Sequence, residues 1–161
     1  MKYFFARTIL ACLITLSGPF AFAADSVSQG TKLLIEIESP YSFDETLEKI
    51  EINARSEGWK VPKKWKVDFQ KNFLRVTDID IGPSKVIKMC EPFAAANIMV
   101  KDENKQLAAM MPCTIAVYVK SNGKTYISMM NLKLIGQMFG GDVAKMTSEL
   151  GPQMEAMLKL K

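Results

Sequence analysis

The hydrophobic residues of this chain change their spacing along the sequence, and each spacing predicts a type of element. From Lys32 to Glu38, apolar and polar residues alternate, which predicts a strand with Leu33, Ile35 and Ile37 on one face. The same alternation predicts further strands over residues 65–69, 85–90, 115–119 and 126–130, with a short additional strand at 73–76.

A period of three to four residues replaces the alternation in four other segments and predicts helices. Ser42 begins the first with the capping-box pattern that Glu45 completes, and Gly58 lies where a C-terminal cap belongs. Pro92 suits the first turn of a second helix, and Asn131 is a cap for a third. The last helix is predicted from residue 142 to 158, interrupted or restarted at Gly151-Pro152, while residues 101–105 are predicted as a charged loop.

A tight β-hairpin is predicted between residues 115 and 130. Its turn contains Asn122-Gly123, a pair typical of the two-residue type I′ turn. Because strands and helices are interleaved while one pair of strands is a hairpin, we expect an α+β fold. The expected domain is single and two-layered, with an antiparallel or mixed sheet of about five strands and two to three helices packed on it.

The first 23 residues have the pattern of a cleavable export signal. Lys2 and Arg7 precede a short apolar run, and Ala21-Phe22-Ala23 gives the small-x-small motif before Ala24. Residues 1–23 are therefore predicted to be a signal peptide and 24–30 a flexible leader, followed by one domain over 31–161. This arrangement favours a periplasmic protein with no stable membrane insertion after cleavage. Cleavage would also remove Cys12.

Composition narrows the chemistry of the remaining chain. Histidine is absent, which excludes Ser-His-Asp and Cys-His nucleophile pairs and histidine-ligated zinc. Loss of Lys2 and Arg7 lowers the formal charge from +4 to +2, and no basic cluster is interleaved with aromatic residues, so we expect no nucleic-acid partner. No catalytic motif is present.

Three segments in this order, with this spacing, resemble the domain-of-unknown-function 302 family. They are SPYSFDET at residues 39–46, CEPFA at 90–94 and MPCTIAVY at 111–118, and the similarity extends from about Lys32 to Ser128. The resemblance implies a two-layer α+β domain that is often a dimer, with no established activity. The family commonly has Asn where this chain has Glu91. That carboxylate would place a negative charge beside Cys90 and oppose an activated thiolate there.

Cys90 and Cys113 are the most distinctive chemical groups of the predicted mature chain. Four interpretations stay open: a structural disulfide, two separate buried thiols, a redox-active pair, and a soft-metal site. If their strands are antiparallel neighbours, the two cysteines can approach each other; a parallel crossover would separate them. The metal interpretation adds Met89, Met110 and Met111 as thioether donors suited to Cu(I).

The chain is also rich in methionine, with 11 residues. Four of them fall at helical spacings that favour core or interface packing: Met138, Met146, Met154 and Met157. The leading hypothesis is a non-enzymatic exported domain that binds a small ligand or a periplasmic protein partner and forms a homodimer. The alternative is a thiol-redox or Cu(I)-handling protein built on Cys90 and Cys113.

Overall fold

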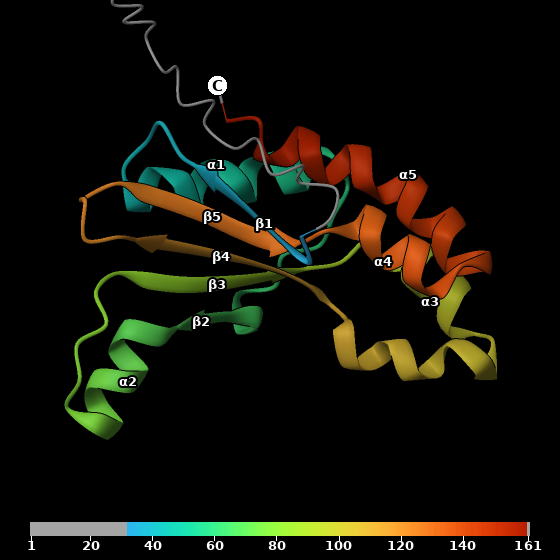
Figure 1. The fold of residues 1–161 in the computed structure, drawn as a ribbon, viewed down its shortest axis with the longest axis horizontal. Coiled ribbons are helices and arrows are strands. Elements are labelled where there is room, and N and C mark those ends of the chain that lie inside the picture. Colours follow the sequence, from blue (N-terminus) through green and yellow to red (C-terminus); the bar gives the residue numbers. More distant parts are fainter. Residues whose placement is uncertain (1–31, 161) are drawn as a thin grey trace, which may run out of the picture.

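The structure is a computed structural model that describes residues 32–160, so the predicted signal peptide, leader and Cys12 lie outside the described residues. The elements form one sheet with helices around it (Figure 1). In chain order they are β1 (Leu34–Glu38), α1 (Phe43–Ser56), η2 (Lys63–Trp65, a 3₁₀ helix), β2 (Lys66–Asp68), α2 (Phe69–Thr77), β3 (Ser84–Met89), α3 (Pro92–Met99), η3 (Asp102–Met110, also 3₁₀), β4 (Cys113–Val119), β5 (Thr125–Met130), α4 (Leu132–Phe139) and α5 (Gly141–Leu158).

The sheet is five-stranded and antiparallel throughout, in the order β1-β5-β4-β3-β2. The α+β class and the strand number are confirmed, and the helices are more numerous than predicted. Within the described part of the chain, no helix is both long and apolar enough to span a bilayer.

One face of the sheet, the covered face, carries the main core. Its central side chains Ile87, Ile115 and Ile127 are at most 1% exposed. They pack with apolar residues of α1 and α5, the two helices that lie along this face (Figure 1). Burial of one such aliphatic side chain contributes roughly 1.5–3 kcal/mol.

The ends of α1 follow the sequence rules. At its start, the Glu45 carboxylate accepts hydrogen bonds from the backbone N–H of Ser42 (3.1 Å) and from its hydroxyl (2.6 Å). At its end, Gly58 has φ +84°, the left-handed conformation that glycine adopts without a Cβ penalty. Trp59 N–H then donates to the Ala54 carbonyl (2.9 Å), and its indole, 1% exposed, turns into the core and donates to Gln153 of α5 (2.9 Å).

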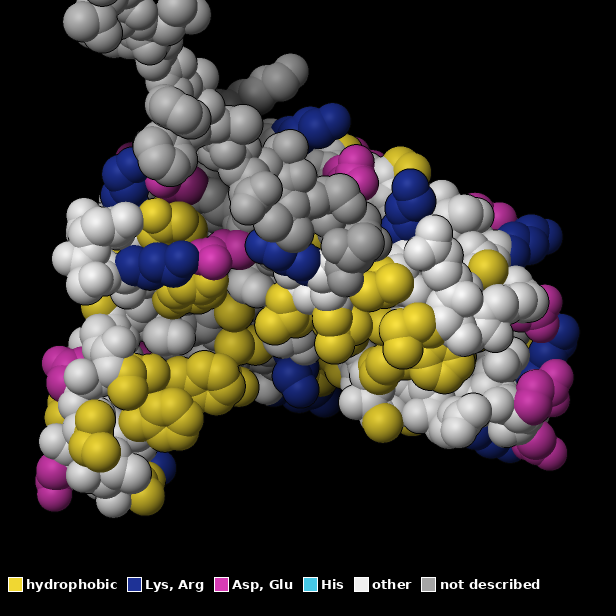
Figure 2. All heavy atoms as spheres, viewed as in Figure 1, with side chains coloured by type: hydrophobic (Ala, Val, Ile, Leu, Met, Phe, Trp, Pro, Cys, Tyr) yellow, Lys and Arg dark blue, Asp and Glu magenta, His cyan; other side chains and the backbone are white. Residues whose placement is uncertain are grey.

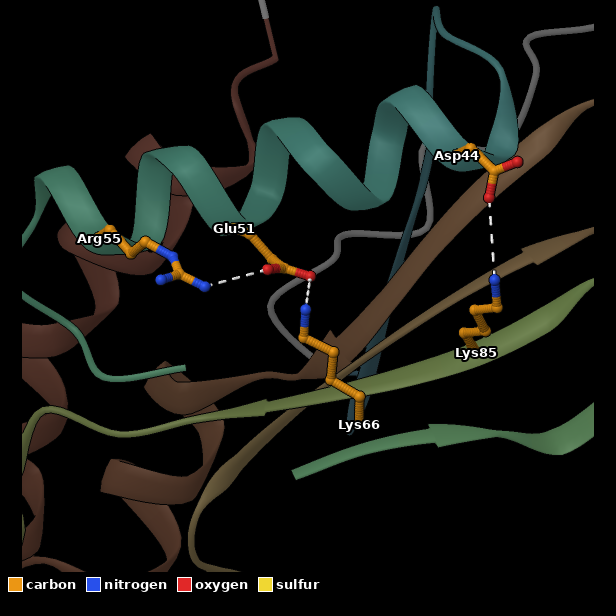
Figure 3. Close-up of polar contacts among 5 residues, drawn as sticks. All are labelled: Asp44, Glu51, Arg55, Lys66 and Lys85. Atoms are coloured by element: carbon orange, nitrogen blue, oxygen red, sulfur yellow. Dashed lines mark hydrogen bonds and ion pairs between the residues drawn. The ribbon is translucent and has the colours of Figure 1, made fainter. Parts of the chain in front are cut away.

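Ion pairs fasten α1 to the β2 edge of the covered face (Figure 3). Glu51 pairs with Lys66 of β2 and with Arg55 one turn along α1 (3.2 Å), and Asp44 lies 3.8 Å from Lys85 of β3. All of these groups are partly exposed, so each pair contributes at most about 1 kcal/mol. They therefore add little to the free energy of unfolding compared with the apolar core.

The segment after β2 differs from the prediction. Trp65, Val67 and Phe69 alternate as a strand would, yet β2 ends at Asp68 and residues 69–77 form α2 in place of a strand at 73–76. The reason is the Asp68 carboxylate, which accepts from the Lys71 N–H (2.9 Å) and caps a new helix. Phe69 and Phe73 then stack one turn apart, with ring centroids at 5.4 Å.

Three smaller predictions are also corrected. The hairpin turn has a left-handed residue only at Gly123 (φ +77°), and the Gly123 N–H donates to the Lys120 carbonyl (2.9 Å). This is a type I turn with a glycine bulge, because a type I′ turn needs positive φ at Asn122 as well. The charged segment at 101–105 belongs to η3, and α5 continues through Pro152 without interruption.

Candidate functional site

The second face of the sheet, which we call the open face, is the first candidate site. Side chains alternate between faces along a strand, so the residues between the core positions point to this side. The register of the strands groups these residues into three rows that run across the sheet. The first row is Lys88, Thr114, Met130 and Leu34; the middle row is Val67, Val86, Ala116, Ser128 and Glu36; the third row is Ser84, Tyr118, Tyr126 and Glu38.

Two helical segments stand at opposite ends of the open face (Figure 1). At the end where β2 finishes, α2 contacts β3, and Val86 is 5% exposed although it belongs to this face. At the other end, the last turn of η3 and the link to β4 lie over the first row. The middle row between them holds the small side chains of Ala116 and Ser128, a register pair.

A hollow of about 340 Å³ opens beside η3, and we call it the methionine hollow. It is lined by Leu34, Lys88, Ala109, Met110, Met111, Pro112, Thr114, Ala116, Ser128, Met129 and Met130. The lining is mainly apolar, with one cation and two hydroxyl groups. This volume lies near the lower end of the range in which proteins hold small molecules.

The third row of the open face is polar and aromatic. Tyr118 and Tyr126 stack at 6.2 Å, and the Lys120 ammonium lies 4.1 Å from the Tyr126 ring centroid. Lys120 also pairs with Glu36, and this contact, with a hydrogen bond from Tyr118, lowers the pKa of the Glu36 carboxyl. The open face is therefore hollow and apolar at one end and bounded by fixed aromatic rings and charges at the other.

The second candidate site is the cysteine pair. β3 and β4 are antiparallel neighbours in which Met89 pairs with Cys113, so Cys90 and Cys113 lie at the same end of the sheet. Both are free thiols in the structure. Burial raises the pKa of the Cys113 thiol to about 11, and the nearby Cys90 adds to this rise.

Glu91 determines the environment of Cys90. Its carboxylate accepts from the backbone N–H groups of Phe93 (3.3 Å) and Ala94 (2.5 Å), the first free donors of α3. Those donors would otherwise favour a thiolate at Cys90. Burial, and then the charge of Glu91, raise the pKa of the Cys90 thiol. Both cysteines consequently keep their protons at neutral pH.

The structure divides the sulfur atoms that were grouped as a Cu(I) site. Met89 is fully buried in the covered-face core, and Cys113 packs against the same core. Met110 and Met111 instead line the methionine hollow, where Met130 joins them. Sequence reasoning missed Met130 and Lys88, because only the strand register shows that they belong to the same row. Within residues 32–160, no cluster of three or more Cys, Asp or Glu side chains has metal-site geometry.

Further hollows lie among the helices, and one of about 220 Å³ is between α1 and α5. A second, of about 240 Å³, is between α3 and α5, beside the ion pair of Lys101 and Asp142. A third, of about 400 Å³, runs between α4 and α5 along small side chains, and Lys133 and Glu155 are also among its lining residues. The lining of these three hollows includes no cysteine and no residue of the sheet.

Comparison with known proteins finds a similar solved structure and a matching family. A crystal structure of the uncharacterized conserved protein DUF302 from Bacillus stearothermophilus is similar, with a TM-score of 0.67. The two share 23% identity over 78% of this chain and 95% of that one. No curated protein matched the sequence. The sequence also matches the family described as "Domain of unknown function DUF302" over residues 35–160. The chain therefore belongs to the DUF302 family.

Proposed function

We propose that this DUF302 protein is an exported, non-enzymatic binding domain that works as a homodimer, with the open face as its interface. The observation that carries the proposal is the apolar surface of α2 beside an uncovered sheet face. Binding is favoured over thiol chemistry because the pKa of each cysteine is raised.

The surface of α2 and the turn after it is unusually apolar for a position in contact with water. Phe73 and Leu74 are each 44% exposed, and Val76 is 70% exposed. Ile79 and Ile81 continue the apolar run at 61% and 44%. Figure 2 shows hydrophobic side chains gathered over α2, at the lower left. Contiguous exposed apolar surface of this type is typical of protein interfaces.

The open face suits a second copy of the same chain because its two ends are complementary. α2 projects at one end, and the methionine hollow is recessed at the other. A two-fold axis parallel to the sheet and directed across the strands exchanges these ends. Each copy would then place its α2 across the mouth of the other copy's methionine hollow, covering this hollow without entering it, as an isologous interface allows.

Light scattering on the chain without residues 1–23 tests this proposal. We expect a dimer for the unmodified protein and a monomer for Leu74→Glu, because a carboxylate would be buried without a partner at the interface. The matched control is Ile52→Glu. Ile52 is an exposed apolar residue (57%) on α1, the helix that packs on the covered face, and its replacement should leave the dimer intact. A monomeric unmodified protein, or equal dissociation by both variants, would contradict the proposal.

A further inference from the structure

We infer that the methionine hollow is a binding site for a small amphipathic anion, with an apolar chain or ring and one carboxylate. The inference rests on the proposed function only in that it uses the same face of the sheet. The site is formed by the residues of one protomer.

The apolar part of the site comes from two segments that are distant in sequence. η3 and the link after it contribute Met110, Met111 and Pro112, and the sheet contributes Leu34 and Met130. Unbranched methionine side chains adapt to ligands of different shape, and they are common at binding surfaces of broad specificity. Ala116 forms the floor with a single methyl group, which leaves the hollow its depth.

Lys88 supplies the charge. It is half-buried in the first row, and Thr114 is its register partner on β4. Lys66, Lys85 and Lys120, on or beside the same sheet, all form ion pairs. Lys88 forms none with any residue between 32 and 160. An ammonium group held at the margin of an apolar hollow is suited to a carboxylate, which can also accept a hydrogen bond from the Ser128 hydroxyl. The Thr114 hydroxyl donates to the Pro112 carbonyl over a long 3.4 Å, and a bound carboxylate could take its place as acceptor.

The same lysine argues against a metal cation in this hollow. Four of its lining residues are methionines, and thioethers are donors for Cu(I). A positive charge on the hollow wall would repel that ion, whereas it attracts an anion. The positive charge of Lys88 therefore favours a carboxylate over Cu(I) as the ligand of this hollow.

The test is isothermal titration with decanoate, decanol and the decyltrimethylammonium ion, each below its micelle concentration. We expect decanoate to bind at one site per protomer, and the other two to bind at least about tenfold more weakly, because each lacks the charge-assisted bond to Lys88. Lys88→Gln should weaken decanoate by a similar factor and leave decanol unchanged. Lys88→Arg should restore decanoate, and Ala116→Trp should abolish binding of both by filling the floor.

The matched control is Lys64→Gln, which removes an exposed lysine from η2 and should bind decanoate like the unmodified protein. Repeating the titration with Leu74→Glu separates the two proposals, since the site should function in a monomer. Equal decanoate affinity in Lys88→Gln and the unmodified protein would overturn the inference. So would stoichiometric Cu(I) binding that depends on Met110, Met111 and Met130 in the absence of decanoate binding.

Discussion

The two faces of this sheet are built from the same strands, yet they differ in what covers them. On β4, Ile115 is fully buried under α1 and α5, while its neighbour Ala116 faces the open side. On β1, Leu34 of the open face is 57% exposed, while Ile35 packs against the core. The covered face is uniformly aliphatic at its centre. The open face mixes methyl groups, hydroxyls, aromatic rings and charges, a composition typical of a surface that is buried only when a partner or ligand is present.

The largest expected effect is the difference in unfolding free energy between truncating a residue on the covered face and truncating one on the open face. Ile115→Ala should cost about 3 kcal/mol of unfolding free energy, because it leaves a cavity in a close-packed core. Leu34→Ala should cost under about 0.5 kcal/mol in a monomer, because that side chain remains in contact with water. Urea unfolding in the Leu74→Glu background measures both. Similar costs at the two positions would show that the open face is as tightly packed as the covered one.

A smaller effect on the covered face depends on pH. The pKa of Cys113 is raised by burial from its ordinary value near 9 to about 11, so the native state disfavours the thiolate. The stability held by the protonated thiol is complete below pH 9 and is lost as pH rises towards 11, with a loss of about 2 kcal/mol at pH 10.5. Under reducing conditions, the difference in unfolding free energy between the unmodified protein and Cys113→Ala should therefore shrink from pH 8 to pH 10.5. A constant difference would mean that Cys113 is hydrated.

The smallest expected effect concerns Cys90, the residue that directly follows β3. Glu91→Gln removes the charge that adds to the burial effect on the pKa of this thiol, so alkylation by iodoacetamide at pH 8 should become about two- to fourfold faster. Mass spectrometry of the Cys90 peptide measures the rate, and Glu103→Gln on η3 is the control. An unchanged rate would assign the raised pKa to burial alone.

The sequence rules succeeded where a local pattern alone decides the structure. Ser42 and Glu45 begin α1, Gly58 ends it, and Asn131 caps α4 through a hydrogen bond from the Leu134 N–H (3.1 Å). Each of these signals lies within one turn of the element that it delimits. The alternation in β4 and β5 similarly located the hairpin, because no helical period competes there.

The same rules failed where two local patterns compete or where distant segments meet. Around Phe69, an alternation of period two overlaps a pair at i and i+4, and the Asp68 cap decides for the helix. Which face of the sheet stays open depends on where α5 packs, far along the chain from β1. The grouping of Lys88 with Met130 depends on the register of three strands. No single segment of the sequence therefore predicts which face stays open or which side chains share a row.

The strand order has a consequence for how the chain assembles. β2, β3, β4 and β5 follow one another and pair with their neighbours in sequence, but β1 pairs with β5, so that Glu38 meets Tyr126. Closing so long a loop is slow compared with forming the meander. When the chain is delivered from its N-terminus, by a ribosome or through a membrane pore, β1 emerges first and must wait for the last strand. Until β1 pairs with β5, the covered-face core lacks its β1 edge and remains accessible to water. A chaperone would bind the chain during this interval.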